Sequence, residues 1–263
     1  MSESSAALTY TSYLALDEIL GAQRPRSDEH DEMLFIVIHQ VYELWFKQIL
    51  HELGHLQGRL EEGNGAHALH TLNRVLTILK VVVSQIDVLE TMTPRQFTSF
   101  RARLEASSGF QSGQFRVLEV TLGRRDRGAY EHYPEGNPWR AQILAAVARP
   151  SLFDSFLRYL AGRGYAVPRE KLERDVRLPS EPSEAVQRVL VQVYHDDGEA
   201  SQIAERLVDV DEGLQEWRYR HVKMVERTIG RKPGTGGSLG AEYLRSTLFN
   251  PIFPDLWAVR GEL

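Results

Sequence analysis

The chain has 263 residues, of which 42% are hydrophobic and 25% charged, so it can bury a sizeable core and has an ordinary globular composition. Asp and Glu outnumber Lys and Arg by 36 to 31, which excludes the global basic field that nucleic acid or anionic lipid requires. Because Cys is absent, disulfides, thiolate nucleophiles, iron–sulfur clusters and cysteine zinc sites are excluded, and any metal must be held by His or carboxylate.

The N-terminal sequence MSESSAALTYTSYLALDEIL has neither a basic start nor an apolar core, so it does not resemble a signal peptide. The most apolar stretches of the chain are interrupted by charge before they reach the length of a membrane span. We therefore expect a cytoplasmic protein with no membrane and no nucleic acid among its partners.

Two long amphipathic helices are predicted first. Residues 33–60 carry apolar side chains in steps of three and four, which predicts a helix of about 28 residues. Its apolar positions are Leu34, Ile38, Val41, Trp45, Ile49, Leu53, Leu56 and Leu60. The same pattern predicts a second helix over 66–90. We expect Pro94 to interrupt the chain before a short helix over 99–106, a polar turn and another helix over 115–123.

The second half of the chain is also predicted to be helical. Residues 124–139, rich in Gly, Pro and charge, are expected to form a surface loop. Further helices are predicted over 140–148, 150–163, 183–195 and 197–229. Gly230 ends the last of them, and a glycine-rich segment and an apolar strap over 250–257 follow. With no alternating strand pattern and no linker, the fold is predicted to be a single all-α domain over 1–263.

Two histidines lie on or beside apolar helix faces. His221 follows Trp217 in the buried stripe of the last long helix, so its imidazole needs either a hydrogen-bond partner in the core or a metal. A cysteine-free helical protein that binds heme would need such a histidine as its axial ligand. His39 falls beside Phe35, where it could serve acid–base chemistry, shape a pocket, or simply be half-covered by a neighbour.

The run HELGH at 51–55 has the spacing of a zinc protease, with His51 and His55 as ligands and Glu52 as base. A helical wheel, however, places both histidines roughly 120–160° from His39 and off the apolar stripe. A catalytic zinc needs a pocket, whereas this face is predicted to be solvated. A zinc hydrolase is therefore a weaker hypothesis.

Two further features suggest ligand contacts. The glycine-rich run GTGGSLG follows a helix rather than a strand, so it does not fit a dinucleotide fingerprint. We expect residues 230–240 to form a mobile lid that brings backbone N–H groups and Thr235 to a ligand. Arg101 is suited to gripping a carboxylate with two parallel hydrogen bonds, although an ordinary surface role is equally compatible with the sequence.

Long segments spread over nearly the whole chain resemble the tryptophan 2,3-dioxygenase family. They are LTYTSYLALDEILGAQ, HDEMLFIVIHQVYELWFKQILHEL, LETMTPRQFTSFRARLEASSGFQS, LVDVDEGLQEWRYRHVKMVERTIG and KPGTGGS. The resemblance implies an all-helical protein that holds heme b and its iron and assembles as a homotetramer, a dimer of dimers. The implied reaction inserts both atoms of O₂ across the indole C2–C3 bond of L-tryptophan and gives N-formylkynurenine.

The resemblance also implies roles for individual residues. His221 would be the axial ligand of the heme iron, and His39 would be the catalytic residue near the indole nitrogen. Phe35 would pack on the substrate, Arg101 would bind its carboxylate, and Thr235 would meet its ammonium group. Phe97 would also contact the substrate. Ser107 and Ser108 would lie beside the heme, and Ser108 would contact the substrate as well. Tyr10, Tyr13 and Leu14, from residues 1–25 of a neighbouring subunit, would line the substrate pocket.

A few positions depart from the common family pattern. Gly113 replaces a large residue, Leu239 replaces a serine, and Ile86 stands where an aromatic residue is common. Gly113 and Leu239 could enlarge or dry parts of the pocket. That leaves an alternative, a biosynthetic paralogue that oxygenates a substituted tryptophan such as a β-methyl derivative, inserting one oxygen to form an oxindole. A heme protein that binds tryptophan without turnover is a further alternative.

Overall fold

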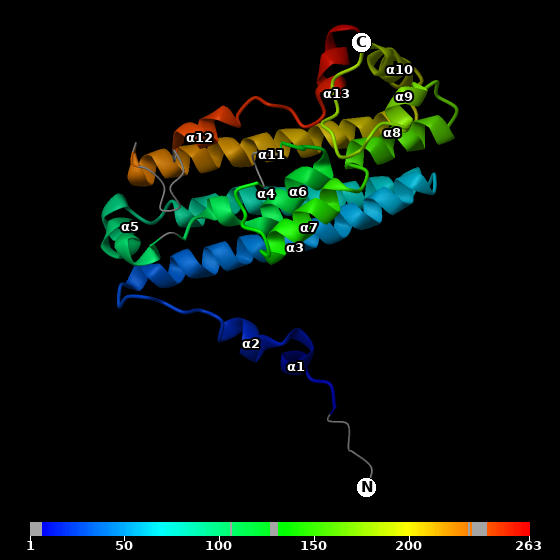
Figure 1. Cartoon of the computed structure of the whole chain (residues 1–263). Helices are drawn as coiled ribbons and strands as arrows, with labels where there is room; N and C mark the ends of the chain where they lie inside the picture. Colours follow the sequence, from blue (N-terminus) through cyan, green and yellow to red (C-terminus); the bar gives the residue numbers. More distant parts are fainter. Residues whose placement is uncertain (1–6, 106, 127–130, 231, 233–240) are drawn as a thin grey trace.

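The computed structural model describes residues 7–105, 107–126, 131–230, 232 and 241–263 (Figure 1). These described residues form helices and no strand, which confirms the all-α prediction. The α-helices are α1 Tyr10–Leu14, α2 Leu16–Leu20, α3 His30–Glu61, α4 Gly65–Leu89, α5 Pro94–Arg101, α6 Gly113–Leu122, α7 Pro138–Val147, α8 Leu152–Gly162, α9 Arg169–Leu172, α10 Glu184–His195, α11 Glu199–Ile229, α12 Ala241–Ser246 and α13 Pro254–Ala258. None of the helices in these segments is long and apolar enough to cross a membrane.

Three long helices, α3, α4 and α11, form the body of the protein, with α4 packed against both of the others (Figure 1). Their apolar stripes meet in one core, where Leu53, Leu72 and Leu207 are completely buried. Burying each such side chain contributes about 1.5–3 kcal/mol. The three helices predicted from periodicity over 33–60, 66–90 and 197–229 are thus confirmed.

The α5 region differs from the prediction. Pro94 begins the helix instead of interrupting it, because proline lacks only an N–H that the first turn leaves unbonded in any case. Thr93 and Gln96 complete the start as a capping box, with the Thr93 N–H donating to Gln96 Oε1 at 2.8 Å. The chain then tightens into a 3₁₀ turn over Ala102–Leu104, so the helix expected over 99–106 was placed too late.

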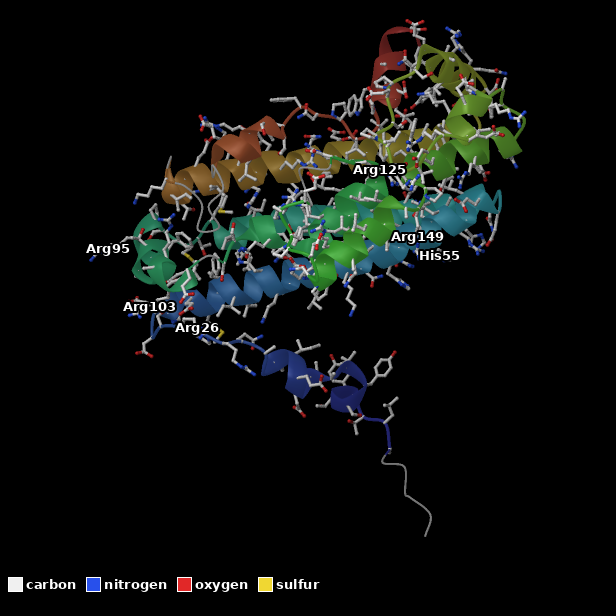
Figure 2. The ribbon with its side chains drawn as sticks, viewed as in Figure 1. Arg26, His55, Arg95, Arg103, Arg125 and Arg149 are labelled. Carbon is white, nitrogen blue, oxygen red and sulfur yellow. The ribbon has the colours of Figure 1, made fainter. Side chains whose placement is uncertain are left out.

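The segment expected to be a surface loop is in part buried. Arg125 and Tyr133 are almost completely covered. The Arg125 guanidinium donates to the carbonyls of Val147 and Arg149 at the end of α7, at 2.6 Å in the case of Arg149 (Figure 2). A cation at a helix C-terminus satisfies carbonyls that the helix leaves free, which explains why a charged residue packs here.

The C-terminal strap packs as predicted. Asp211 on α11 is completely buried, and its Oδ2 accepts hydrogen bonds from the backbone N–H groups of Ile252 and Phe253 at 2.8 and 3.0 Å. Trp257 Nε1 donates to the same oxygen at 3.0 Å. The carboxylate therefore ties the strap to the helix that also carries His221.

The N-terminal segment behaves differently from the body. Helices α1 and α2 have no buried residue, and together they stand away from α3 (Figure 1). We call residues 7–22 the arm.

Candidate functional site

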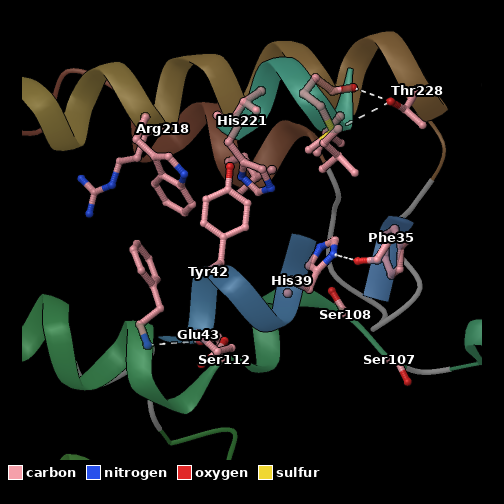
Figure 3. A pocket seen from close by; sticks show the side chains of 18 of the residues that line it. Phe35, His39, Tyr42, Glu43, Ser107, Ser108, Ser112, Arg218, His221 and Thr228 are labelled. Carbon is pink, nitrogen blue, oxygen red and sulfur yellow. Dashed lines mark hydrogen bonds between the residues drawn. The ribbon is translucent and has the colours of Figure 1, made fainter. Parts of the chain in front are cut away.

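A cavity of about 250 Å³ opens between the first half of α3, α5, α6 and the last turns of α11. Figure 3 shows side chains of α3 and α11 pointing toward one another across it. The predicted site residues that line it are Phe35, His39, Phe97, Arg101, Ser107, Ser108 and His221. Positions scattered over nearly two hundred residues are thereby brought to one place.

His221 faces this cavity from α11 (Figure 3). Its ring is stacked on Trp217, with centroids 5.3 Å apart and planes 5° from parallel. None of the described residues offers the imidazole a hydrogen bond. Burial, with a smaller contribution from His39, lowers its pKa to about 4. The ring is therefore neutral at pH 7, and its lone pair is free to bind a metal, which favours the ligand hypothesis over a satisfied core histidine.

His39 faces the cavity from α3. Its Nδ1 lies 2.7 Å from the Phe35 carbonyl oxygen, and because a carbonyl can only accept, Nδ1 carries the proton (Figure 3). Burial lowers the pKa of His39, against the opposing effects of the Phe35 carbonyl and Glu43. In the neutral ring, Nε2 is then the acceptor.

One wall of the cavity is aromatic and carries a cation beside it. The ring centroid of Phe35 lies 5.7 Å from that of Phe97 and also 5.7 Å from that of Phe100. Arg101, in the last turn of α5, lines the same cavity. An apolar wall next to a guanidinium suits a ligand that has an aromatic part and a carboxylate.

The opposite end of the cavity is polar, and sequence reasoning missed it. Buried Glu119 on α6 accepts from Arg116 at 2.6 Å and from Arg218 at 2.8 Å. Arg218 is 4% exposed, and its other terminal nitrogen has no partner among the described residues. The signal was present in the sequence, since Glu119 lies between the apolar residues Leu118 and Val120 of a predicted helix and three residues after Arg116.

Comparison with known proteins gives the family. The family model for tryptophan 2,3-dioxygenase matches residues 1–141 and 149–263. A protein named tryptophan 2,3-dioxygenase from Anaeromyxobacter sp. (strain K) is 71% identical, covering 98% of this chain and 97% of its own length. Proteins of the same name from Herpetosiphon aurantiacus and Caulobacter vibrioides are 55% and 46% identical, over 98% and 97% of this chain and 100% and 98% of their own lengths. This chain belongs to the tryptophan 2,3-dioxygenase family.

Some expected site residues of this family member lie away from its own cavity. Tyr10, Tyr13 and Leu14 are on the arm, where Tyr10 and Tyr13 are 75% and 71% exposed. They do not line the cavity of their own chain. Thr235 and Leu239 fall outside the described residues.

Gly113 does not enlarge the pocket of this family member, contrary to expectation. It does not line the cavity, and its backbone is covered by the indole of Trp139. A Cβ built on Gly113 would lie 2.2 Å from that ring. Trp139 thus fills the space beside Gly113, and Gly113 gives no support to the alternative of a substituted-tryptophan paralogue. Ile86, by contrast, does line the cavity.

The HELGH run also lies outside the site. His51 and His55 are exposed on α3, and Figure 2 shows His55 on its outer side. Glu52 is buried, where it accepts from Arg74 at 3.2 Å and from Gln48 at 2.7 Å. Its carboxylate is therefore committed to structural contacts, and no group of three metal-ligating side chains forms within the described segments.

Proposed function

We propose that this chain is a heme-dependent dioxygenase that inserts both atoms of O₂ across the indole C2–C3 bond of L-tryptophan, giving N-formylkynurenine. The observation that carries the proposal is His221, a neutral imidazole without a partner among the described residues, at the wall of an aromatic cavity. The names of relatives at 46–71% identity support the same reaction.

The residues around the cavity fit heme b. His221 would hold the heme iron through its imidazole nitrogen, and Ser107 and Ser108 border the same space. At the polar end, Arg218 lies beside Arg116 and has one terminal nitrogen with no partner among the described residues, which suits the acidic side chains of the group. When bound, heme iron supplies the O₂ chemistry that no protein side chain can perform.

The chain itself binds and orients the amino acid. Arg101 would hold the substrate carboxylate and Thr235 its ammonium group, while Phe35 and Phe97 pack against the indole. Fixing both ends of the substrate supplies orientation, and the aromatic wall keeps water away from the reacting bond.

His39 would hold the indole N–H. Because Nδ1–H is bound to the Phe35 carbonyl, Nε2 is available only as an acceptor toward the cavity. The catalytic role of His39 is then to accept the indole N–H in a hydrogen bond, which fixes the ring relative to the iron.

The working unit would be a homotetramer, a dimer of dimers in the cytoplasm, built from single-domain chains over 1–263. In it, Tyr10, Tyr13 and Leu14 of each arm would complete the pocket of a neighbour, and residues 230–240 would act as a lid. Support comes from the exposure of these side chains and from their distance from the cavity of their own chain.

The test is reconstitution with heme followed by turnover of L-tryptophan. The wild-type protein should show a heme absorption band and form N-formylkynurenine, and His221→Ala should lose the band. His51→Ala, an exposed histidine on α3, is the matched control and should keep both. Full heme binding by His221→Ala, or loss of a zinc ion from His51→Ala together with activity, would refute the proposal.

A further inference from the structure

The arm presents large apolar side chains that no described part of the chain covers. Leu8, Tyr10, Tyr13 and Leu20 are between 71% and 75% exposed. Side chains of this size gathered on one short segment are typical of a contact with another protein. The direction in which the arm leaves the body therefore decides where these side chains can bind.

That direction is set close to the start of α3. Glu32 is 1% exposed, and its carboxylate accepts three hydrogen bonds from the chain just before the helix (Figure 2 labels Arg26). The donors are the backbone N–H groups of Arg26 and Ser27, both at 2.8 Å, and the Ser27 hydroxyl at 2.6 Å. In an ordinary capping box, the third helical residue reaches back only to the N-cap. Here Glu32 reaches further and closes the turn through which the arm departs.

A second tie comes two turns later on the same helix. The side-chain amide of Gln23 donates to Gln40 Oε1 at 2.7 Å, and Gln40 donates to the Ala22 carbonyl at 3.4 Å. Phe35 and His39 lie between Glu32 and Gln40 along α3. The same turns that line this chain's cavity thus hold its arm away from that cavity.

We propose that Glu32 is a positioning residue: its carboxylate fixes the turn at residues 26–27 so that the arm reaches a second copy of this chain beside that copy's cavity. The proposal rests on the proposed function for the role of the arm in substrate binding. A second copy is the occupant because the ties to α3 keep Tyr10 and Tyr13 off their own cavity, while their exposure requires a cover.

The hydrogen bonds of the Glu32 carboxylate predict a series of variants with graded effects on the turn. Glu32→Ala leaves two backbone N–H groups and a hydroxyl without their acceptor. Glu32→Gln keeps one acceptor oxygen and the shape of the side chain, so it should rescue part of the effect. Ser27→Ala removes one donor only and should be the mildest. Glu29→Ala is the matched control, since Glu29 is an exposed acid at the N-cap of α3 whose side chain makes no cap hydrogen bond.

The first measurement is limited trypsin digestion of the full-length assembly, following cleavage after Arg26, which Ser27 follows. We expect Glu32→Ala to be cut about tenfold faster than wild type, because the local opening that exposes the turn no longer breaks charge-assisted hydrogen bonds. Glu32→Gln should be intermediate and Glu29→Ala unchanged. Equal cleavage of Glu32→Ala and wild type would overturn the claim that Glu32 fixes the turn at residues 26–27.

The second measurement separates positioning from folding. Glu32→Ala should raise KM for L-tryptophan several-fold, while kcat at saturation and heme content stay unchanged, because only uniform substrate binding is lost. Faster cleavage with an unchanged KM would overturn the link to a partner's cavity. A chain that binds no heme and shows no turnover would refute the proposed function instead. The digestion would still test whether Glu32 fixes the turn at residues 26–27.

Discussion

The two cavity histidines differ in what their surroundings leave available. His39 is locked by the Phe35 carbonyl into the tautomer that accepts through Nε2, whereas His221 has no hydrogen bond from the described residues and is free to bind a metal. Because burial lowers the pKa of both rings and favours their neutral form, His39 can act as a hydrogen-bond acceptor and His221 as a metal ligand.

Burial lowers the pKa of His39 below its ordinary value of 6.5, and the opposing Phe35 carbonyl and Glu43 do not restore it. Nε2 therefore remains an acceptor as the pH falls through 6.5, and kcat/KM for L-tryptophan should decline only at lower pH, where the ring gains its proton. A pH profile of kcat/KM checks this. Half-loss of kcat/KM at 6.5 or above, absent from His39→Ala, would contradict it.

Arg101→Ala should raise KM for L-tryptophan at least about tenfold, because a charge-assisted contact with the carboxylate is lost. Heme content should stay unchanged. Arg103→Ala is the matched control, since Arg103 is exposed only two residues away and does not line the cavity. An unchanged KM in Arg101→Ala would refute the carboxylate assignment.

At the scale of elements, Gly113 and Trp139 form a pair that joins α6 to α7. Gly113→Ala should lower the free energy of unfolding by about 1–3 kcal/mol, because its Cβ overlaps the indole of Trp139. In a Trp139→Ala background the same substitution should cost little. Denaturant unfolding of the four proteins of this double-mutant cycle checks the coupling.

The control for this cycle is Gly54→Ala, where a Cβ would meet nothing within 4 Å in the middle of α3. It should raise the free energy of unfolding by about 0.5–1 kcal/mol, as expected for alanine in a helix. Equal effects at Gly54 and Gly113 would show that Trp139 does not fill the space beside Gly113.

Helical periodicity predicted the long elements well, because a stripe of apolar residues has only one way to be buried against a neighbour. It failed where single contacts decide. Pro94 was predicted to interrupt the chain, but it begins α5, because Thr93 caps the start of that helix. Arg125 was predicted to lie in a surface loop, but it donates to carbonyls at the end of α7. The cap depends on the local backbone geometry, and the carbonyls are distant from Arg125 in the sequence.

The candidate site was only partly predictable for the same reason. Periodicity singled out His221 and placed His39 beside an apolar stripe, but only the resemblance to a family joined them in one cavity. Glu119 and Arg218 were missed as a pair, because Arg218 comes from α11 and reaches Glu119 only in the folded protein, whereas Arg116 lies on α6 with Glu119.

At the scale of the whole molecule, the arm and the cavity of one chain are separate, so they should complement each other between chains. A chain with Tyr10→Ala and Tyr13→Ala keeps an intact cavity, and Arg101→Ala keeps an intact arm. Each alone should turn over L-tryptophan poorly at low concentration. Co-expressed, they should exceed the sum of the two, because some cavities receive an intact arm. Activity equal to that sum would show that the arm does not act on a partner.

The most direct measurement is the mass of the product formed from L-tryptophan by reduced, heme-loaded protein under labelled O₂. We expect one ring-opened product, N-formylkynurenine, that carries two labelled oxygen atoms. A product with a single labelled oxygen, or turnover of a substituted tryptophan only, would contradict it.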